Sequence, residues 1–277
     1  MTAPFFDQTI SECKSLPENS KLRSSLSTVS LLEAWTEQTE SIKPTAFIFH
    51  VSRCGSTLLS QLLSLMEENI VLSEVPFFDE LLRRGFTQQQ MDEMLPVLKS
   101  AITLYGAKRN NRQKNLFIKT DSWHIHFYRE LRLLYPDVPF IFLYRRPDEV
   151  IRSHQKLRGM HAVPGVIEPA LFGFKADEAI QMNLDEYTAA VLETYYKGIT
   201  AIITKDKNAM AINYNEEAMN MMDKIAAFTK LEIQPHDAAA MMQRTEFNAK
   251  HPDKKFSESP INEQQPPVYM QNAFELY

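Results

Sequence analysis

Short apolar runs that alternate with longer amphipathic stretches define the pattern of this chain from residue 45 onward. The first run, residues 46–51, is rich in aromatic residues and bounded by loop residues, which is typical of a strand buried on both faces. Gly55 interrupts this run, and residues 57–66 then carry leucines at helical spacing. The sequence therefore predicts a strand, a tight loop and a helix, in that order.

The same alternation recurs along the chain. Further short apolar runs predict strands at residues 70–72, 116–118, 139–144 and 209–214. Amphipathic stretches predict helices at residues 88–105 and 122–134, from Pro147 onward, at 175–204, and again after the last strand. Strands that alternate with helices imply a parallel sheet with right-handed crossovers and helices on both faces. We therefore expect a three-layer α/β fold that binds ligands at the carboxyl ends of its strands.

Two flanking segments lie outside this alternation. Residues 1–44 are polar and rich in Ser and Glu, with one helical pattern near residues 30–37, and they are interpreted as an N-terminal extension. From residue 248 onward Lys and Pro become frequent and periodicity is lost, which predicts a surface loop and tail over 248–277. The expected organisation is one α/β domain, 45–277, that follows the extension and includes this tail.

Composition narrows the class of protein. A chain of 277 residues, 44% of them hydrophobic, can bury one large core. The formal net charge of −5 provides no general basic field, so we expect no nucleic-acid partner and only a local anion site. The two cysteines, Cys13 and Cys54, suggest no disulfide framework and favour a reducing, cytoplasmic setting. Because no run of about 18 apolar residues occurs, we also expect no membrane association.

The loop after the first strand is the candidate anion site. A strand, the loop of residues 52–57 and a helix form the arrangement in which backbone N–H groups and a helix N-terminus converge on a phosphate. Gly55 allows close approach of the backbone, and Arg53 adds a guanidinium for a bidentate phosphate contact. The Ser56 and Thr57 hydroxyls add donors. The simpler interpretation is a helix start after a buried strand.

Spacing excludes two other phosphate loops. The nucleotide-kinase loop G-x-x-x-x-G-K-[ST] requires Gly and Lys where this chain has His50 and Ser56. A thiol phosphatase requires an arginine several residues after its cysteine, whereas Arg53 precedes Cys54. Cys54 is therefore interpreted as a small loop residue and not as a nucleophile.

A second motif supports an anion site. Residues 145–153 read Arg-Arg-Pro-Asp-Glu-Val-Ile-Arg-Ser and follow a predicted strand, so Arg145 leaves the strand end and Ser153 lies about two turns along the next helix. Together the two motifs resemble the sulfotransferase superfamily, whose 5′-phosphosulfate loop reads roughly [KR]-[ST]-G-[ST]-T. The family's 3′-phosphate motif reads R-x-P-x-[DE]-x-x-x-S. The similarity extends weakly over residues 46–256.

The resemblance implies a P-loop NTPase-like sulfotransferase fold and 3′-phosphoadenosine 5′-phosphosulfate (PAPS) as co-substrate. The implied reaction moves a sulfuryl group to a hydroxyl or amine of a small-molecule, glycan or peptide acceptor. The resemblance places the following residues around the nucleotide: Arg53, Cys54, Gly55, Ser56, Thr57, Arg145, Ser153, Lys254 and Lys255. A small-molecule kinase and a catalytically inactive nucleotide-binding relative are the alternative functions.

The resemblance also suggests catalytic residues. Sulfuryl transfer needs cations near the leaving oxygen and a base for the acceptor, and Arg53 and Lys119 match the family's cations. Lys119 equally fits a strand-end lysine whose ammonium group reaches water. For the base, Glu74 resembles a glutamate of the tyrosylprotein and heparan-type members and is the preferred candidate. Asp121 stands where cytosolic members have histidine, but it also fits a helix N-cap.

Two further groups of residues have open roles. His124 and His126 lie two positions apart, so on a helix they point to different faces, and we expect no metal. Residues 158–174 are irregular and long enough for an acceptor-side lid. Five aromatic residues fit either an acceptor pocket or the core: Phe77, Phe78, Trp123, Phe172 and Phe174.

Overall fold

The computed structural model describes residues 5–19, 26–249, 255 and 266–277. Five parallel strands in the order β2-β3-β1-β4-β5 form its central sheet. The strand bounds are β1 Ala46–His50, β2 Asn69–Ser73, β3 Asn115–Lys119, β4 Phe140–Tyr144 and β5 Ala209–Asn213. Each predicted strand is present, and the sheet confirms the expected α/β fold class.

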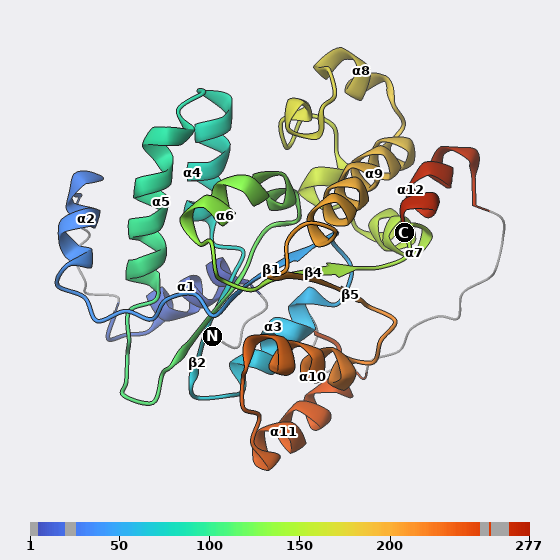
Figure 1. Ribbon diagram of the computed structural model, residues 1–277. Coiled ribbons are helices and arrows are strands. Elements are labelled where there is room, and N and C mark those ends of the chain that lie inside the picture. Colours follow the sequence, from blue (N-terminus) through green and yellow to red (C-terminus); the bar gives the residue numbers. More distant parts are fainter. Residues whose placement is uncertain (1–4, 20–25, 250–254, 256–265) are drawn as a thin grey trace.

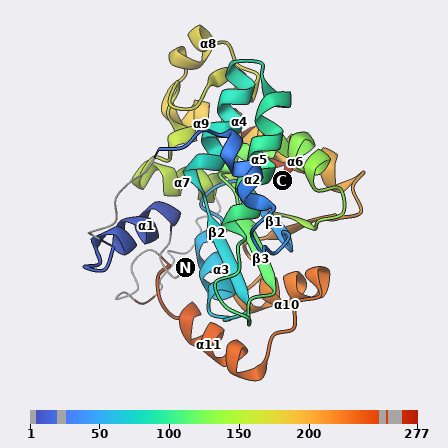
Figure 2. The ribbon, with the colours of Figure 1, turned by 90° about the vertical axis from the view of Figure 1, so that its left-hand side faces the viewer.

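Helices cover both faces of the sheet. Helices α3 (Ser56–Ser64), α10 (Ala218–Thr229) and α11 (Pro235–Thr245) lie on one side (Figures 1 and 2). The other side carries four helices: α4 (Pro76–Thr87), α5 (Met91–Tyr105), α6 (Tyr128–Leu134) and α9 (Leu184–Ile203). The sheet is therefore the middle of three layers, as the alternating pattern predicts.

Strand burial explains why the apolar runs form this sheet. All five residues of β1 are buried, and the Phe49 ring stacks on Phe142 of β4 with ring centroids 4.8 Å apart. Phe47 packs edge-on against Phe140 at 5.2 Å. Strands covered on both faces need apolar side chains at every position, and this requirement explains the continuous runs in the sequence.

Because the sheet is parallel, the carboxyl ends of β1, β2 and β3 meet at one edge. Ser73 pairs with Lys119 in register, and the Glu74 N–H donates to the Lys119 carbonyl at 2.8 Å. The Thr120 N–H donates to the Ile48 carbonyl of β1 at 3.0 Å. The residues that follow these three strands are therefore neighbours in space, although they are far apart in the sequence.

Several helices differ from the sequence expectation. The pattern missed α1 (Phe6–Ser15) and α4, whereas α2 (Ser30–Thr36) lies where a helix was expected. The long helix predicted over 175–204 is two helices, α8 (Ala176–Gln181) and α9, because the Asn183 side chain accepts from the N–H groups of Asp185 and Glu186 and starts α9 anew.

The C-terminal end of the chain also differs from the expected surface tail. Residues 268–270 form a 3₁₀ turn and α12 (Gln271–Leu276) follows it, with Ala273 buried. The Tyr277 hydroxyl accepts from the Asn213 side-chain amide at 2.7 Å, so this end is tied to the last strand of the sheet. The division at residue 44 into extension and domain remains a prediction.

Among the helices of the described residues, none combines the length and the apolar character needed to cross a membrane.

Candidate functional site

A cleft of about 370 Å³ lies beyond the carboxyl ends of β1, β2 and β3. Pockets of this size and place are the usual ligand sites of parallel α/β sheets. The predicted site residues that line it are Arg53, Cys54, Gly55, Ser56, Thr57, Glu74, Asp121 and Ser153. Residues from seven separate segments contribute to its wall, and the anion loop is the longest of these contributions.

The backbone of the anion loop is held in an uncommon conformation. Ser52 and Arg53 have φ angles of 71° and 52°, and Glu74, across the cleft, has 53°. A left-handed conformation costs a non-glycine residue about 1–2 kcal/mol. Three of the five non-glycine residues with positive φ among the described residues thus line this cleft. Strain of this kind concentrates at functional sites.

Gly55, with φ 74°, is the N-cap residue of α3, and no side chain caps this helix. A Cβ atom at Gly55 would lie 2.6 Å from Cε2 of Tyr214, which follows β5. The loop therefore requires glycine both for its backbone angle and for the room that the Tyr214 ring takes. The buried Ser56 and Thr57 begin α3, so the positive end of the helix faces the cleft.

Arg53 is a cation with spare hydrogen-bonding capacity. Its Nη2 donates to the Leu157 carbonyl at 2.6 Å, whereas its buried Nε has no hydrogen-bond partner among the residues that the structure describes. Burial lowers the pKa of Arg53, although an arginine remains charged at any physiological pH. A buried donor without a partner is rare in proteins and suits an anion that enters the cleft.

Arg145 lies directly behind the loop. Its Nη1 donates to the Arg53 carbonyl at 3.1 Å, and its guanidinium stacks 4.2 Å from the Tyr214 ring centre. Its Nε donates to Glu149 on α7 (Pro147–Lys156) at 3.1 Å. Ser153, further along α7, lines the cleft. The two predicted phosphate motifs are thus joined, and Arg145 holds the loop from behind while Ser153 faces the cleft.

Lys119 and Glu74 form an ion pair at the cleft wall. Lys119 Nζ donates to Glu74 Oε1 at 2.5 Å, and the Lys119 side chain has no exposed surface. Lys119 is therefore not a strand-end lysine whose ammonium group reaches water. The Nε2 atom of His50 lies 3.3 Å from the same carboxylate oxygen and 3.0 Å from the Thr120 carbonyl. Because both neighbours of His50 Nε2 are acceptors, this nitrogen carries the proton.

The two candidate bases differ in their acidity. Burial by itself would raise the pKa of Glu74, but the Lys119 ammonium and the His50 hydrogen bond outweigh it and hold the pKa well below its usual value. Burial raises the pKa of Asp121 to about 7. Glu74 is thus a firmly ionised carboxylate, whereas Asp121 can exchange a proton near neutral pH.

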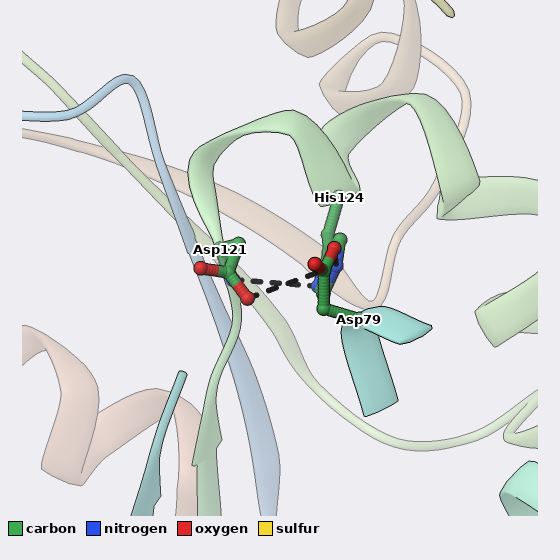
Figure 3. Close-up of side chains that lie close together, drawn as sticks. All are labelled: Asp79, Asp121 and His124. Carbon is green, nitrogen blue, oxygen red and sulfur yellow. Dashed lines mark hydrogen bonds and ion pairs between the residues drawn. The ribbon is translucent and has the colours of Figure 1, made fainter. Parts of the chain in front are cut away.

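Asp79 of α4, Asp121 and His124 bring their ligand-type atoms within 4.8 Å of one another (Figure 3). His124 Nδ1 accepts from the Asp121 N–H at 3.3 Å, and His124 Nε2 lies 3.0 Å from Asp79 Oδ1. With Nδ1 accepting, Nε2 carries the proton and donates it to Asp79. Trp123 Nε1 also donates to Asp79 Oδ1, at 2.6 Å. These hydrogen bonds connect Asp121 through His124 to Asp79.

Cys54 is buried, and its Sγ contacts the Leu143 carbonyl at 3.5 Å. Burial raises the pKa of its thiol to about 12, so the reactive thiolate is disfavoured. This environment fits a small loop residue. Cys13 and Cys54 are both free cysteines.

The C-terminal loop reaches the cleft with Asn248 and Ala249. Gln61 of α3 donates to the Ala249 carbonyl at 2.9 Å and anchors the loop there. Lys254 lies outside the described residues. Lys255 is exposed and forms an isolated backbone bridge with Phe247. Both lysines remain predicted nucleotide contacts.

Only one of the five predicted aromatic residues, Trp123, lines the cleft. Phe78 packs edge-on against Tyr105, and Phe172 contacts Tyr187 and Tyr195 in the core. The irregular segment 158–174 does reach the cleft, through its Gly159, Met160 and His161.

Sequence reasoning missed four residues that shape the site: Phe5, His50, Tyr214 and His161. His50 carried a usable signal, since it is the one ionisable residue in the apolar run 46–51. Phe5 and His161 carried none, because they lie in segments without periodicity. Tyr214 stood only at the end of the predicted strand 209–214, although it contacts both phosphate motifs.

Comparison with solved structures shows which known proteins share this fold. The sulfotransferase domain of the Synechococcus PCC 7002 olefin synthase aligns over 86% of this chain and 94% of its own length, with a TM-score of 0.53 and 15% identity. A sulfotransferase from Mycobacterium avium aligns over 80% and 76%, with a TM-score of 0.51 and 13% identity. No family model and no curated protein sequence matches the chain. The chain thus has the α/β fold found in these sulfotransferases.

Proposed function

We propose that this protein is a sulfotransferase that moves a sulfuryl group from PAPS to a hydroxyl or amine acceptor. The observation that carries the proposal is the joining of two phosphate motifs at one cleft: Arg145 donates to the carbonyl of Arg53 and stacks on Tyr214, which packs against Gly55. The shared fold agrees with this proposal.

The donor would lie with its 5′-phosphosulfate on residues 53–57. The N-terminus of α3, the Ser56 and Thr57 hydroxyls and the unpartnered Arg53 Nε provide donors there. Ser153 would receive the 3′-phosphate, and Arg145, which does not line the cleft, would position the loop through the Arg53 carbonyl. An adenosine bisphosphate presents two separated phosphates, which matches two separated donor groups better than a single phosphate does.

In the transfer step, the acceptor oxygen or nitrogen attacks the sulfur atom. The bond between sulfur and the bridging phosphate oxygen breaks, and adenosine 3′,5′-bisphosphate leaves with the electron pair. The proton of the acceptor passes to a base. Arg53 would stabilise the charge that develops on the bridging oxygen.

The contacts favour Asp121 over Glu74 as that base. A general base works best when its pKa lies near the working pH, and the pKa of Asp121 is about 7. Glu74, which the sequence favoured, is bound to Lys119 and His50 and would serve as their partner. Lys119 does not line the cleft and would act through Glu74, as a positioning residue.

Calorimetric titration with adenosine 3′,5′-bisphosphate tests the donor site. Binding to the wild-type protein without Mg²⁺, and loss of binding in Arg145→Ala, is the expected result. Transfer of radiolabelled sulfate from PAPS to a panel of phenols, sugars and peptides then tests the reaction. Absence of nucleotide binding to the wild-type protein would refute the proposal, and Mg²⁺-dependent ATP turnover would indicate a kinase instead.

A further inference from the structure

Part of the cleft lining belongs to neither phosphate motif, and we call this part the second end of the cleft. Phe5, Trp123, Met160 and His161 line it, and they come from the N-terminal segment, the turn after β3 and the irregular segment 158–174. The Phe5 ring centre lies 5.6 Å from Lys119 Nζ, which is bonded to Glu74. Phe5 therefore contacts Lys119, the residue that binds the Glu74 carboxylate at the cleft wall.

Helix α1 positions Phe5. Phe6, the first residue of this helix, is buried and contacts the Tyr105 ring of α5, with ring centres 5.4 Å apart. Tyr105 in turn packs against Phe78 in the core. The contact of Phe6 with the core fixes the start of α1, so Phe5 is held at the cleft although the segment 20–25 separates α1 from the rest of the chain.

His161 is the polar group at this end. It is 2% exposed, and its Nε2 has no hydrogen-bond partner among the residues that the structure describes. Its ring lies beside Trp123, with centres 6.3 Å apart. Burial lowers the pKa of His161 well below the usual value, so the imidazole is neutral. A buried, neutral ring nitrogen without a partner suits one hydrogen bond to an uncharged ligand group.

The charges around this end of the cleft disfavour a ligand that carries a carboxylate. Two carboxylates, Glu74 and Asp121, line this part of the cleft. Of the nearby cations, Lys119 is already paired with Glu74, and Arg53 is assigned to the phosphosulfate of the donor. A carboxylate placed beside these groups would lose its hydration and meet like charge. The aromatic and thioether side chains favour apolar surface.

We propose that Phe5, Trp123, Met160 and His161 form the acceptor subsite, that it takes a neutral hydroxyl compound with an apolar ring or chain, and that Phe5 determines its specificity. The identity of this end as the acceptor side rests on the proposed function. The N-terminal helix is then part of the active site and not an appendage to it.

Two probes of nearly equal shape test the subsite by equilibrium binding, followed by their own fluorescence. The probes are 2-naphthol and 6-hydroxy-2-naphthoate, which differ by one carboxylate, and adenosine 3′,5′-bisphosphate is present at saturation. We expect 2-naphthol to bind at least about tenfold more tightly than the naphthoate. Phe5→Ala is expected to weaken 2-naphthol binding about fivefold to tenfold and to leave nucleotide binding unchanged.

Leu16→Ala is the matched control, because Leu16 ends the same helix and is 49% exposed. It should bind both probes as the wild type does. Equal affinity for the two probes, no binding of 2-naphthol, or an unchanged affinity in Phe5→Ala would each overturn the inference. Absence of nucleotide binding with retained 2-naphthol discrimination would instead remove only the proposed sulfotransferase function.

His161→Ala and His161→Asn separate the polar contact from simple packing. Loss of 2-naphthol affinity in the alanine variant, with partial recovery in the asparagine variant, is expected if a hydrogen bond is made. Equal affinity of both variants and the wild type would remove His161 from the subsite.

Discussion

The guanidinium of Arg145 donates a 3.1 Å hydrogen bond to the carbonyl oxygen of Arg53, 92 residues earlier in the chain. The same guanidinium stacks on Tyr214, whose ring occupies the space beside Gly55. One side chain therefore connects the two motifs that the sequence suggests for the two phosphates of a nucleotide. This contact explains how a strained loop keeps one conformation.

Replacement of Arg145 should affect the loop and the nucleotide together. We expect Arg145→Ala to weaken binding of adenosine 3′,5′-bisphosphate by about thirtyfold or more, since truncation of a buried, hydrogen-bonded charge costs about 2 kcal/mol or more. Arg146→Ala is the control, because the Arg146 guanidinium bonds to its neighbour Asp148 and lies 5.7 Å from the Phe274 ring centre, whereas Arg145 bonds to the loop. Calorimetry on both variants measures the difference, and equal affinities would contradict the role of Arg145.

Gly55→Ala should destabilise the protein as well as the site. The added Cβ would stand 2.6 Å from the Tyr214 ring, and φ 74° is itself unfavourable for alanine. We expect a loss of about 2 kcal/mol or more in the free energy of unfolding, and loss of nucleotide binding. Urea denaturation measures the first effect. Gly165→Ala, at φ 81° but with nothing within 4 Å, isolates the cost of the backbone angle alone.

The pH dependence of transfer should distinguish the two bases. If Asp121 is the base, kcat rises with pH and levels off above about 7, because only the ionised carboxylate accepts the proton. If Glu74 were the base, its low pKa would leave kcat flat over the same range. A flat profile between pH 5.5 and 8.5 would therefore return the role to Glu74.

Asp121→Asn should stabilise the fold at alkaline pH. The folded-state pKa of Asp121 is raised above its unfolded value, so the folded state binds more protons, and stability falls as pH rises from about 4 through 7. The neutral asparagine removes this penalty and keeps a residue suited to an N-cap. We expect a higher Tm than wild type at pH 8 and little difference at pH 4. A lower Tm at pH 8 would contradict the raised pKa.

Glu74→Gln should have the opposite effect. It leaves the fully buried Lys119 without its counter-charge, and breaking such a pair costs about 3 kcal/mol. The double variant Glu74→Gln/Lys119→Met removes both charges and should recover much of that loss. Thermal unfolding of wild type and the three variants, Lys119→Met included, tests this coupling. Additive effects would show that the two residues do not interact.

The sequence by itself determined the layered α/β architecture and the position of the anion loop. Both follow from local physics: strands buried on two faces need continuous apolar runs, and residues after parallel strands meet at one edge. Local sequence patterns predicted helices less well where the position of a helix depends on contacts with residues far away in the chain. The pattern missed α1, whose place depends on the contact of Phe6 with Tyr105, and it did not separate α8 from α9, which the Asn183 cap divides.

Only the tertiary structure decided what the charged residues of the site do. Lys119 and Asp121 each had two interpretations in the sequence, and Glu74 was the preferred base, because the role of a carboxylate or an ammonium depends on its neighbours and its burial. Packing placed Lys119 against Glu74 and buried Asp121, which separated the acidities of the two carboxylates. Packing also brought Phe5 and His161 into the wall of the same cleft, although the segments that carry them show no periodic pattern in the sequence.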